Sequence, residues 1–287
     1  MNGDRSAKWG VQVFATGAIL AVQRDALLWA HAVLLGVLQG LTEFLPVSSS
    51  GHLALAEAIF HLTQPGLALE AGLHLGTLSA VLWVYRGDLG RWTALARPSG
   101  ERVSLWIVAV GTLPVAVAGL LASSIVDRLF ASLGAVGGGW ILTGVVLLLG
   151  ARHRAGSRTA GELRWADALW IGCAQALALV PGISRSGATI ATGMWRELKP
   201  VEAARFSFLL SIPAVTGAVV LEIGGLWNAL ASGGGWTICL AIAVALASGV
   251  AAIRYCVGVL TRGGLASFGY YCLALGVLTL LHAVVGA

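Results

Sequence analysis

The stretch Gln39-Gly-Leu-Thr-Glu-Phe-Leu-Pro-Val-Ser-Ser-Ser-Gly-His52 breaks a long apolar region, Ala26–Phe60, near its middle. A second apolar region, Ala166–Met194, is broken in the same way by Pro181-Gly-Ile-Ser-Arg-Ser-Gly187. The arms beside each break are short, because a helix needs about 20 residues to cross the hydrocarbon core of a bilayer. We therefore expect two pairs of half-helices, each of which enters the membrane, turns and leaves on the same side. Irregular backbone at that depth must be shielded by protein or line a wet cavity, so the two turns are candidates for a binding site.

The composition indicates a membrane protein. Hydrophobic residues make up 57% of the 287 and charged residues 11%, whereas soluble domains carry about 25% charged residues. A chain this apolar cannot cover its surface with polar groups in water. The net charge of +5 does not indicate a nucleic-acid partner, because the basic residues lie in short gaps between apolar runs, as cytoplasmic anchors do. The four cysteines lie inside apolar stretches without metal-ligand spacing, so we expect no disulfide.

Six further apolar segments are long enough to span the membrane. They are Leu67–Tyr85, Val103–Val126, Leu133–Gly150, Phe206–Leu226, Trp236–Leu260 and Leu265–Val285. Pro114 and Pro213 lie inside two of them and predict kinks. The expected fold is an all-α polytopic membrane protein with six transmembrane helices and four re-entrant half-helices. Residues 1–24 form an N-terminal extension, predicted to be an interfacial helix or a short anchor.

The two broken regions are related to each other in sequence. A shift of 136 residues aligns Gln39 with Gln175, Ser48 with Ser184, Ser50 with Ser186, and Gly51 with Gly187. Residues 25–287 are therefore predicted to form a single membrane domain of two repeats, about 25–150 and about 164–287. The positive-inside rule places the arginine-rich gaps 86–102 and 152–164 in the cytoplasm. Three spans per repeat is an odd number, so the halves have opposite orientations and their polar breaks approach each other from opposite faces.

The first break carries a carboxylate close to hydroxyl groups. Gln39 and Glu43 are four residues apart, which puts them on one face of a helix. A glutamate at membrane depth is costly without a partner, so we interpret Glu43 as a metal ligand or a proton carrier rather than a packing residue. The turn that follows offers hydroxyls, backbone N–H groups and an imidazole, which suit a phosphate; it contains Ser48, Ser49, Ser50 and His52. An N-cap explains one of these serines but not three.

The second break carries an arginine between two serines. An arginine is expensive in a membrane-embedded turn, and its planar guanidinium binds phosphate oxygens through two parallel hydrogen bonds. Arg185 is therefore the strongest candidate for substrate binding, ahead of a role as a snorkelling cytoplasmic residue. Hydroxyls and close backbone approach are added by Gly182, Ser184, Ser186, Gly187 and Thr189. The other polar residues of the spans are expected to serve packing or the interface; they are Glu57, Glu70, His74 and Glu222.

These two breaks resemble the signatures of the undecaprenyl-diphosphate phosphatase family, also called the bacitracin-resistance protein family. The first signature is Glu or Gln, three residues, then Glu followed by Phe-Leu-Pro-Val-Ser-Ser and Gly-His; the second is Pro-Gly-x-Ser-Arg-Ser-Gly-x-Thr, here Pro181–Thr189. A looser likeness covers most of Ala26–Val285. The resemblance implies a functional core of Glu43, Ser49, His52 and Arg185. It implies substrate-binding support from Gln39, Ser48, Ser50, Ser184, Ser186, Gly187 and Thr189.

The activity implied by this resemblance is hydrolysis of undecaprenyl diphosphate to undecaprenyl phosphate, which recycles the cell-wall lipid carrier and confers bacitracin resistance. The family works at the outer face of the bacterial plasma membrane, on a polyprenyl diphosphate lipid, with a divalent cation, Mg²⁺ or Ca²⁺, expected at Glu43. Some members have Glu where this chain has Gln39, so a metal site with two carboxylates is disfavoured. Membrane lipid is the other expected partner, and a homodimer is one option.

Two points of mechanism and class stay open at this stage. Ser49 is one candidate nucleophile, activated by His52 and giving a phosphoserine; the other is water activated by His52 or Glu43. The competing class is a transporter or flippase of polyprenyl phosphate lipids, because inverted repeats with broken helices are a transporter design. An intramembrane serine protease is disfavoured, because it needs Gly-x-Ser-Gly and Ser184–Gly187 lacks the first glycine.

Overall fold

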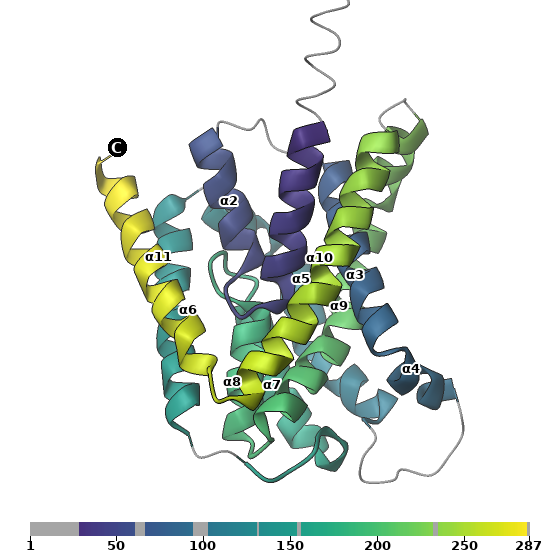
Figure 1. Ribbon diagram of the computed structural model, residues 1–287, viewed down its shortest axis with the longest axis vertical. Coiled ribbons are helices and arrows are strands. Elements are labelled where there is room, and N and C mark those ends of the chain that lie inside the picture. The colour runs from purple at the N-terminus through teal and green to yellow at the C-terminus, as the bar shows by residue number, and fades with distance from the viewer. Residues whose placement is uncertain are drawn as a thin grey trace, which may run out of the picture.

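The computed structural model describes residues 29–60, 67–93, 103–130, 132–153, 156–231 and 235–285. Within these ranges the chain is helical apart from turns, short connections and one isolated bridge between Arg158 and Leu198, and it contains no strand. The helices form one bundle (Figure 1). This confirms the all-α prediction for the described part of the chain. The predicted N-terminal extension, 1–24, lies outside it.

Within the described ranges, five helices are long and apolar enough to cross a membrane. They are α5 (Leu105–Phe130), α6 (Leu133–Arg152), α9 (Pro200–Ala229), α10 (Gly235–Thr261) and α11 (Leu265–Val285). Each covers one of the predicted spans. Pro114 and Pro213 lie inside α5 and α9, and both helices continue through them.

The remaining predicted span is a shorter apolar helix, α3 (Leu67–Val84), of 18 residues. It packs between α9 and α10. A Cβ at Gly76 of α3 would lie only 2.6 Å from the backbone oxygen of Ile242, so the glycine allows α3 to pack directly on α10. The polar helix α4 (Arg86–Thr93), which the sequence did not predict, follows directly.

Two helical hairpins enter this bundle from opposite ends (Figure 1). The first consists of the helix over 29–44 and α2 (Ser49–Phe60), and the second of α7 (Trp165–Leu177) and α8 (Arg185–Trp195). With 12, 13 and 11 residues, α2, α7 and α8 are far too short to span a bilayer. Their turns, 45–48 and 178–184, lead directly into the first residues of α2 and α8, and the two polar breaks of the sequence lie here. We call residues 45–51 the first tip and residues 178–187 the second tip.

Helix α6 holds both tips in place. The buried indole of Trp140 donates a hydrogen bond to the backbone oxygen of Val47 in the first tip, at 2.8 Å. One turn further along, the Thr143 hydroxyl donates to the backbone oxygen of Gly182 in the second tip, at 3.0 Å. The tips also touch directly, because Ser186 Oγ donates to the backbone oxygen of Leu45 at 3.0 Å. Backbone groups that a half-helix leaves unpaired are thus satisfied by protein.

Helix α6 also packs closely along α11 through two glycines on each helix. A Cβ at Gly144 would lie 2.9 Å from the backbone oxygen of Gly269, and a Cβ at Gly276 would lie 2.9 Å from that of Gly137. Small residues at these four positions let the two backbones meet. The two glycines of each helix are seven residues apart, and Gly144 meets Gly269 as Gly276 meets Gly137. The contact is therefore approximately symmetric when α6 and α11 are exchanged.

Candidate active site

The two tips share one capping pattern. The backbone N–H of Gly51 donates to Ser48 Oγ at 3.3 Å, and that of Gly187 donates to Ser184 Oγ at 3.0 Å. A serine at each N-cap therefore pairs a backbone donor that the first turn of a helix leaves free. A second serine, Ser50 in α2 or Ser186 in α8, lies within 3.3 Å and 3.2 Å of its capping serine, respectively. These are the residues that the shift of 136 aligns.

Each tip also contains one residue with left-handed backbone geometry. Gly182 has φ +84°, and a Cβ there would lie 2.1 Å from the backbone oxygen of Val136, so only glycine fits. Ser48 has φ 68° although it carries a side chain, a conformation that costs on the order of 1–3 kcal/mol. Packing by α6 and the serine cap hold this strained residue, and the hydroxyl of the following serine, Ser49, bonds to Glu43.

Glu43 and Arg185 come from different hairpins and form an ion pair. Arg185 Nη2 lies 2.6 Å from Glu43 Oε1, with both side chains largely buried. The other carboxylate oxygen, Oε2, accepts hydrogen bonds from Ser49 Oγ at 2.7 Å and from Gln39 Nε2 at 3.1 Å. Three residues predicted for the functional core, Glu43, Ser49 and Arg185, therefore share one connected network.

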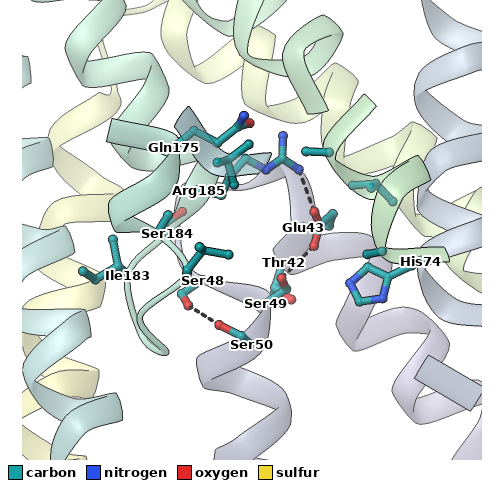
Figure 2. Close-up of a pocket in the computed structure, with 16 residues that line it drawn as sticks. Thr42, Glu43, Ser48, Ser49, Ser50, His74, Gln175, Ile183, Ser184 and Arg185 are labelled. Carbon is teal, nitrogen blue, oxygen red and sulfur yellow. Dashed lines mark hydrogen bonds and ion pairs between the residues drawn. The ribbon is translucent and has the colours of Figure 1, made fainter. Parts of the chain in front are cut away.

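This network borders a cavity of about 210 Å³ (Figure 2). Its polar side contains Glu43, Ser48, Ser49, Ser50, Ser184 and Arg185. Its other side is apolar and comes from the long helices α5 and α9, with Val115, Ala214, Val215 and Ala218. A polar head and an apolar tail could therefore meet different sides of one cavity. A guanidinium, several hydroxyls and a helix N-terminus converge here, and all of them suit an anion with phosphate oxygens.

The structure places His52 outside the cavity. Its Nδ1 lies 2.7 Å from the backbone oxygen of Ser48, and its Nε2 lies 2.7 Å from the Tyr271 hydroxyl. The ring stacks on Tyr271 of α11 and meets Trp140 edge-on. Both ring nitrogens thus have partners other than Ser49, whose hydroxyl bonds to Glu43 instead. In this geometry His52 supports the first tip from behind.

Several of the predicted substrate-binding residues also lie behind the cavity. Ser186, Gly187 and Thr189 are buried in α8. The Thr189 and Ser207 hydroxyls lie 2.6 Å apart, which ties α8 to α9, and Arg185 Nη1 donates to the backbone oxygen of Ser207 at 3.4 Å. These residues hold the second tip, while Ser184 and Arg185 reach the cavity.

Three polar residues that border the cavity were not predicted as functional. The Thr42 hydroxyl donates to the backbone oxygen of Leu38 at 2.6 Å, within its own helix. Gln175 of α7 is 1% exposed, and neither end of its amide has a hydrogen-bond partner within the described residues. The only sequence signal for it was its alignment with Gln39. His74 of α3 lies on the other side of Glu43 (Figure 2), and its buried Nδ1 has no partner among the described residues. The sequence favoured packing for His74, because nothing in it shows that α3 faces the first tip.

A divalent cation would find a small set of protein ligands here. Within the part of the chain that the structure describes, no group of three or more His, Cys, Asp or Glu side chains could hold a metal ion. Glu43 provides one carboxylate, and Gln39 Oε1 beside it is buried without a partner among the described residues. Mg²⁺ is often bound by one or two protein groups together with substrate phosphates and water, so this pair of oxygens fits such an ion.

A second cavity, of about 390 Å³, lies at the far end of the second hairpin and contains Arg158, Glu162, Arg164, Asp167, Arg196 and Glu197. The buried carboxylate of Asp167 pairs with Arg158 at 2.8 Å and with Arg196 at 2.7 Å. Hydrogen bonds from the backbone N–H and the hydroxyl of Thr159 lower the pKa of the exposed Glu162. Two of the three arginines are thus committed to Asp167, which ties α7 to α8 and to the preceding loop.

Taken together, the fold and the site define a class: an α-helical membrane protein of several spans whose two hairpin tips build a cavity with groups that suit a phosphate-bearing ligand. The chain belongs to the bacitracin resistance protein BacA family, which it matches over residues 32–278. It is 42% identical over 260 residues to an undecaprenyl-diphosphatase of Myxococcus xanthus, with 88% of each chain covered.

Two further relatives show similar likeness. The chain is 40% identical over 259 residues to an undecaprenyl-diphosphatase of Carboxydothermus hydrogenoformans, covering 89% of this chain and 98% of the relative. It is 42% identical over 267 residues to an undecaprenyl-diphosphatase of Desulfosudis oleivorans, covering 87% of this chain and 97% of the relative. The resemblance stated from the two signatures is confirmed.

Proposed function

We propose that this chain is a membrane-embedded undecaprenyl-diphosphatase that converts undecaprenyl diphosphate to undecaprenyl phosphate and inorganic phosphate. The relatives with that activity cover nearly the whole chain. The observation that carries the proposal is the contact between Ser49 and Glu43: a hydroxyl donates at 2.7 Å to a carboxylate whose other oxygen pairs with an arginine. A nucleophile, a base and an anion-binding group are the three parts that phosphoryl transfer requires.

In the first chemical step Ser49 Oγ attacks the terminal phosphorus. Its proton passes to Glu43, the oxygen–phosphorus bond to serine forms, and the bond to the bridging oxygen breaks. Undecaprenyl phosphate leaves with the bridging oxygen, and Arg185 stabilises the negative charge on the transferring phosphoryl group. The contact of Ser49 with Glu43 rather than His52 supports Glu43 as the base.

In the second step water attacks the phosphoserine. Before this attack Glu43 gives the serine proton to solvent. It then accepts a proton from the attacking water, the bond between the serine oxygen and phosphorus breaks, and Glu43 returns that proton to Ser49 Oγ as inorganic phosphate leaves. His52 acts through position, because it holds the backbone of Ser48 and packs against Tyr271 and Trp140.

A divalent cation, Mg²⁺ or Ca²⁺, would be held by Glu43 with help from Gln39 Oε1. When bound it supplies positive charge that neutralises the diphosphate and its leaving group. Arg185 pairs with the same carboxylate, so Glu43 would hold the cation and the guanidinium close together at the phosphates.

For the fold, we propose six transmembrane helices, with α3 as the sixth, and four re-entrant half-helices in an inverted repeat of about 25–150 and 164–287. The self-symmetric contact of α6 with α11 and the matching caps of the two tips support this arrangement. The protein would lie in the bacterial plasma membrane, with its arginine-rich gaps in the cytoplasm and its cavity opening toward the outer face. The apolar side of the cavity, from α5 and α9, would lead the prenyl tail into lipid.

The decisive experiment measures phosphate release from a long-chain and a short-chain prenyl diphosphate by the purified protein in detergent micelles, with and without a chelator. Micelles have no leaflets, so phosphate release there cannot come from a flippase. We expect turnover by the wild type, and a loss of about a thousandfold or more in Arg185→Ala. Leu177→Ala is a control, because Leu177 lies on α7 with its side chain 66% exposed. The absence of phosphate release by the wild type under all conditions would overturn the proposal.

A further inference from the structure

The amide of Gln175 is buried at the cavity without a partner of its own. Its residue is 1% exposed, and both Oε1 and Nε2 lack a hydrogen-bond partner among the described residues. Burying an amide with neither end bonded costs free energy, and such groups in native proteins are usually completed by a ligand or water. Figure 2 shows Gln175 next to Arg185 on the side of the cavity formed by α7.

Its counterpart in the first hairpin explains why the amide is free. Gln39 donates from Nε2 to Glu43, four residues later on the same helix face. The residue four positions after Gln175 is Leu179, which has no polar atom to receive a hydrogen bond and also borders the cavity. The second hairpin therefore keeps the glutamine but lacks its acceptor. Among the described residues that border the cavity, Gln175 is the one amide whose donor is unused and directed toward the same space as Arg185.

We propose that Gln175 is a substrate-binding residue, whose Nε2 donates a hydrogen bond to a non-bridging oxygen of the phosphate that Arg185 holds. The ligand class is a phosphate or diphosphate oxyanion, and the proposal rests on the proposed function. A neutral amide adds a directed donor without adding charge, so it completes the coordination of the phosphate while the guanidinium supplies the electrostatic attraction.

Three variants test this role. Gln175→Met keeps nearly the same volume and a good helix former but removes both polar atoms. Gln175→Glu keeps the shape and places a negative charge beside the phosphate. Leu177→Ala is the matched control on the same helix, because its side chain is exposed. Each protein is purified in detergent, and KM, kcat and the melting temperature with and without inorganic pyrophosphate are measured.

For Gln175→Met we expect a KM for a prenyl diphosphate about 10- to 100-fold above wild type, with kcat changed much less, because the bond is made in the ground state as well as in the transition state. The melting temperature without ligand should not fall, since an unpaired buried amide has been replaced by an apolar group. The rise in melting temperature caused by pyrophosphate should shrink. Gln175→Glu should raise the KM further. If Gln175→Met does not fold, the KM of Gln175→Glu is the test of the proposal.

A wild-type KM and a wild-type response to pyrophosphate in Gln175→Met, or in Gln175→Glu if only that variant folds, would overturn the role of Gln175 and leave its amide to water alone. This outcome differs from a failure of the proposed function, in which the wild type itself releases no phosphate. A pyrophosphate response that is lost in the Gln175 variants but kept in Leu177→Ala supports the assignment, because a purely structural residue would lower the melting temperature instead.

Discussion

At the first tip, Ser48 caps α2 and lies beside Ser50; at the second tip, Ser184 caps α8 and lies beside Ser186. The residue between the paired serines is Ser49 in the first tip and Arg185 in the second. The residues that the two tips share build the turns, and the residues in which they differ reach the same carboxylate. The chemistry of the site is therefore located where the two repeats differ.

The same division holds in the part of each hairpin that precedes the paired serines. Gln39 and Gln175 match, but Glu43 is matched by Leu179. Had both hairpins the acid, two carboxylates would repel each other in one cavity. Had both the arginine, the first tip would lack the Ser49 hydroxyl that attacks the phosphate. One acid and one cation from opposite hairpins make a site that neither half could form alone.

The largest effect is expected from making the two tips alike. Arg185→Ser gives the second tip the serine found at the corresponding position of the first, so the caps stay intact while the guanidinium is lost. We expect kcat/KM to fall by about a thousandfold or more, because an arginine on a transferring phosphoryl group contributes that much. Phosphate release in detergent measures this loss. Arg185→Lys keeps the positive charge but not the planar guanidinium, so it should recover only part of the wild-type kcat/KM. Activity near wild type in Arg185→Ser would contradict the claim that the difference between the two tips carries the chemistry.

A somewhat smaller effect is expected from neutralising the acid of the first hairpin. Glu43→Gln keeps a hydrogen-bonding side chain of equal size beside Ser49 but removes the base, so kcat should fall by about 10²- to 10⁴-fold. The response of the rate to added Mg²⁺ or to a chelator should weaken as well. Leu177→Ala, in the second hairpin with an exposed side chain, is the comparison variant. If it reduced kcat as much as Glu43→Gln does, the loss could not be assigned to the acid.

A moderate loss of stability is expected when either of the hydrogen bonds that α6 donates to the two tips is removed. Trp140→Phe removes the hydrogen bond to Val47. Thr143→Val removes the one to Gly182 and also the acceptor of the Ser184 backbone N–H. Each leaves a buried backbone oxygen unpaired, at a cost of about 1–3 kcal/mol, so the melting temperature should drop in both. Because the tips meet in one site, both changes should also lower kcat. A normal kcat in either variant would show that its tip holds its position without α6.

The smallest effect concerns the caps. Ser48→Ala and Ser184→Ala should each lower the free energy of unfolding by about 1 kcal/mol, because each removes one N-cap hydrogen bond. Thermal unfolding of the two variants side by side measures the difference. Equal losses are expected from the matching geometry, whereas a loss at only one tip would show that the tips are not built alike.

Much of this arrangement could be predicted from the sequence, because broken apolar regions, arginine-rich gaps and a shift of 136 residues depend only on local patterns. The meeting of Glu43 with Arg185 followed from the expectation that the two polar breaks approach each other from opposite faces, and the structure brings the two residues into contact. The contact of Ser49 with Glu43 did not follow, since it depends on the left-handed backbone of Ser48.

Other residues could not be placed without tertiary structure. The direction of the His52 ring is set by Tyr271, more than two hundred residues away in the chain. His74 reaches the cavity because α3 packs between α9 and α10, and no periodicity within α3 indicates which face meets the first tip. The unpaired amide of Gln175 is recognisable only once the acceptors around it are known.

The shared site of Glu43 and Arg185 is tested most directly by a double-mutant cycle on kcat/KM, with Glu43→Asp, Arg185→Lys and the double variant, whose residual rates stay measurable. Side chains that act on one phosphate as a unit should couple, so the double variant should be only slightly slower than the slower single variant. Losses that multiply independently, with no coupling between the two positions, would contradict a common site.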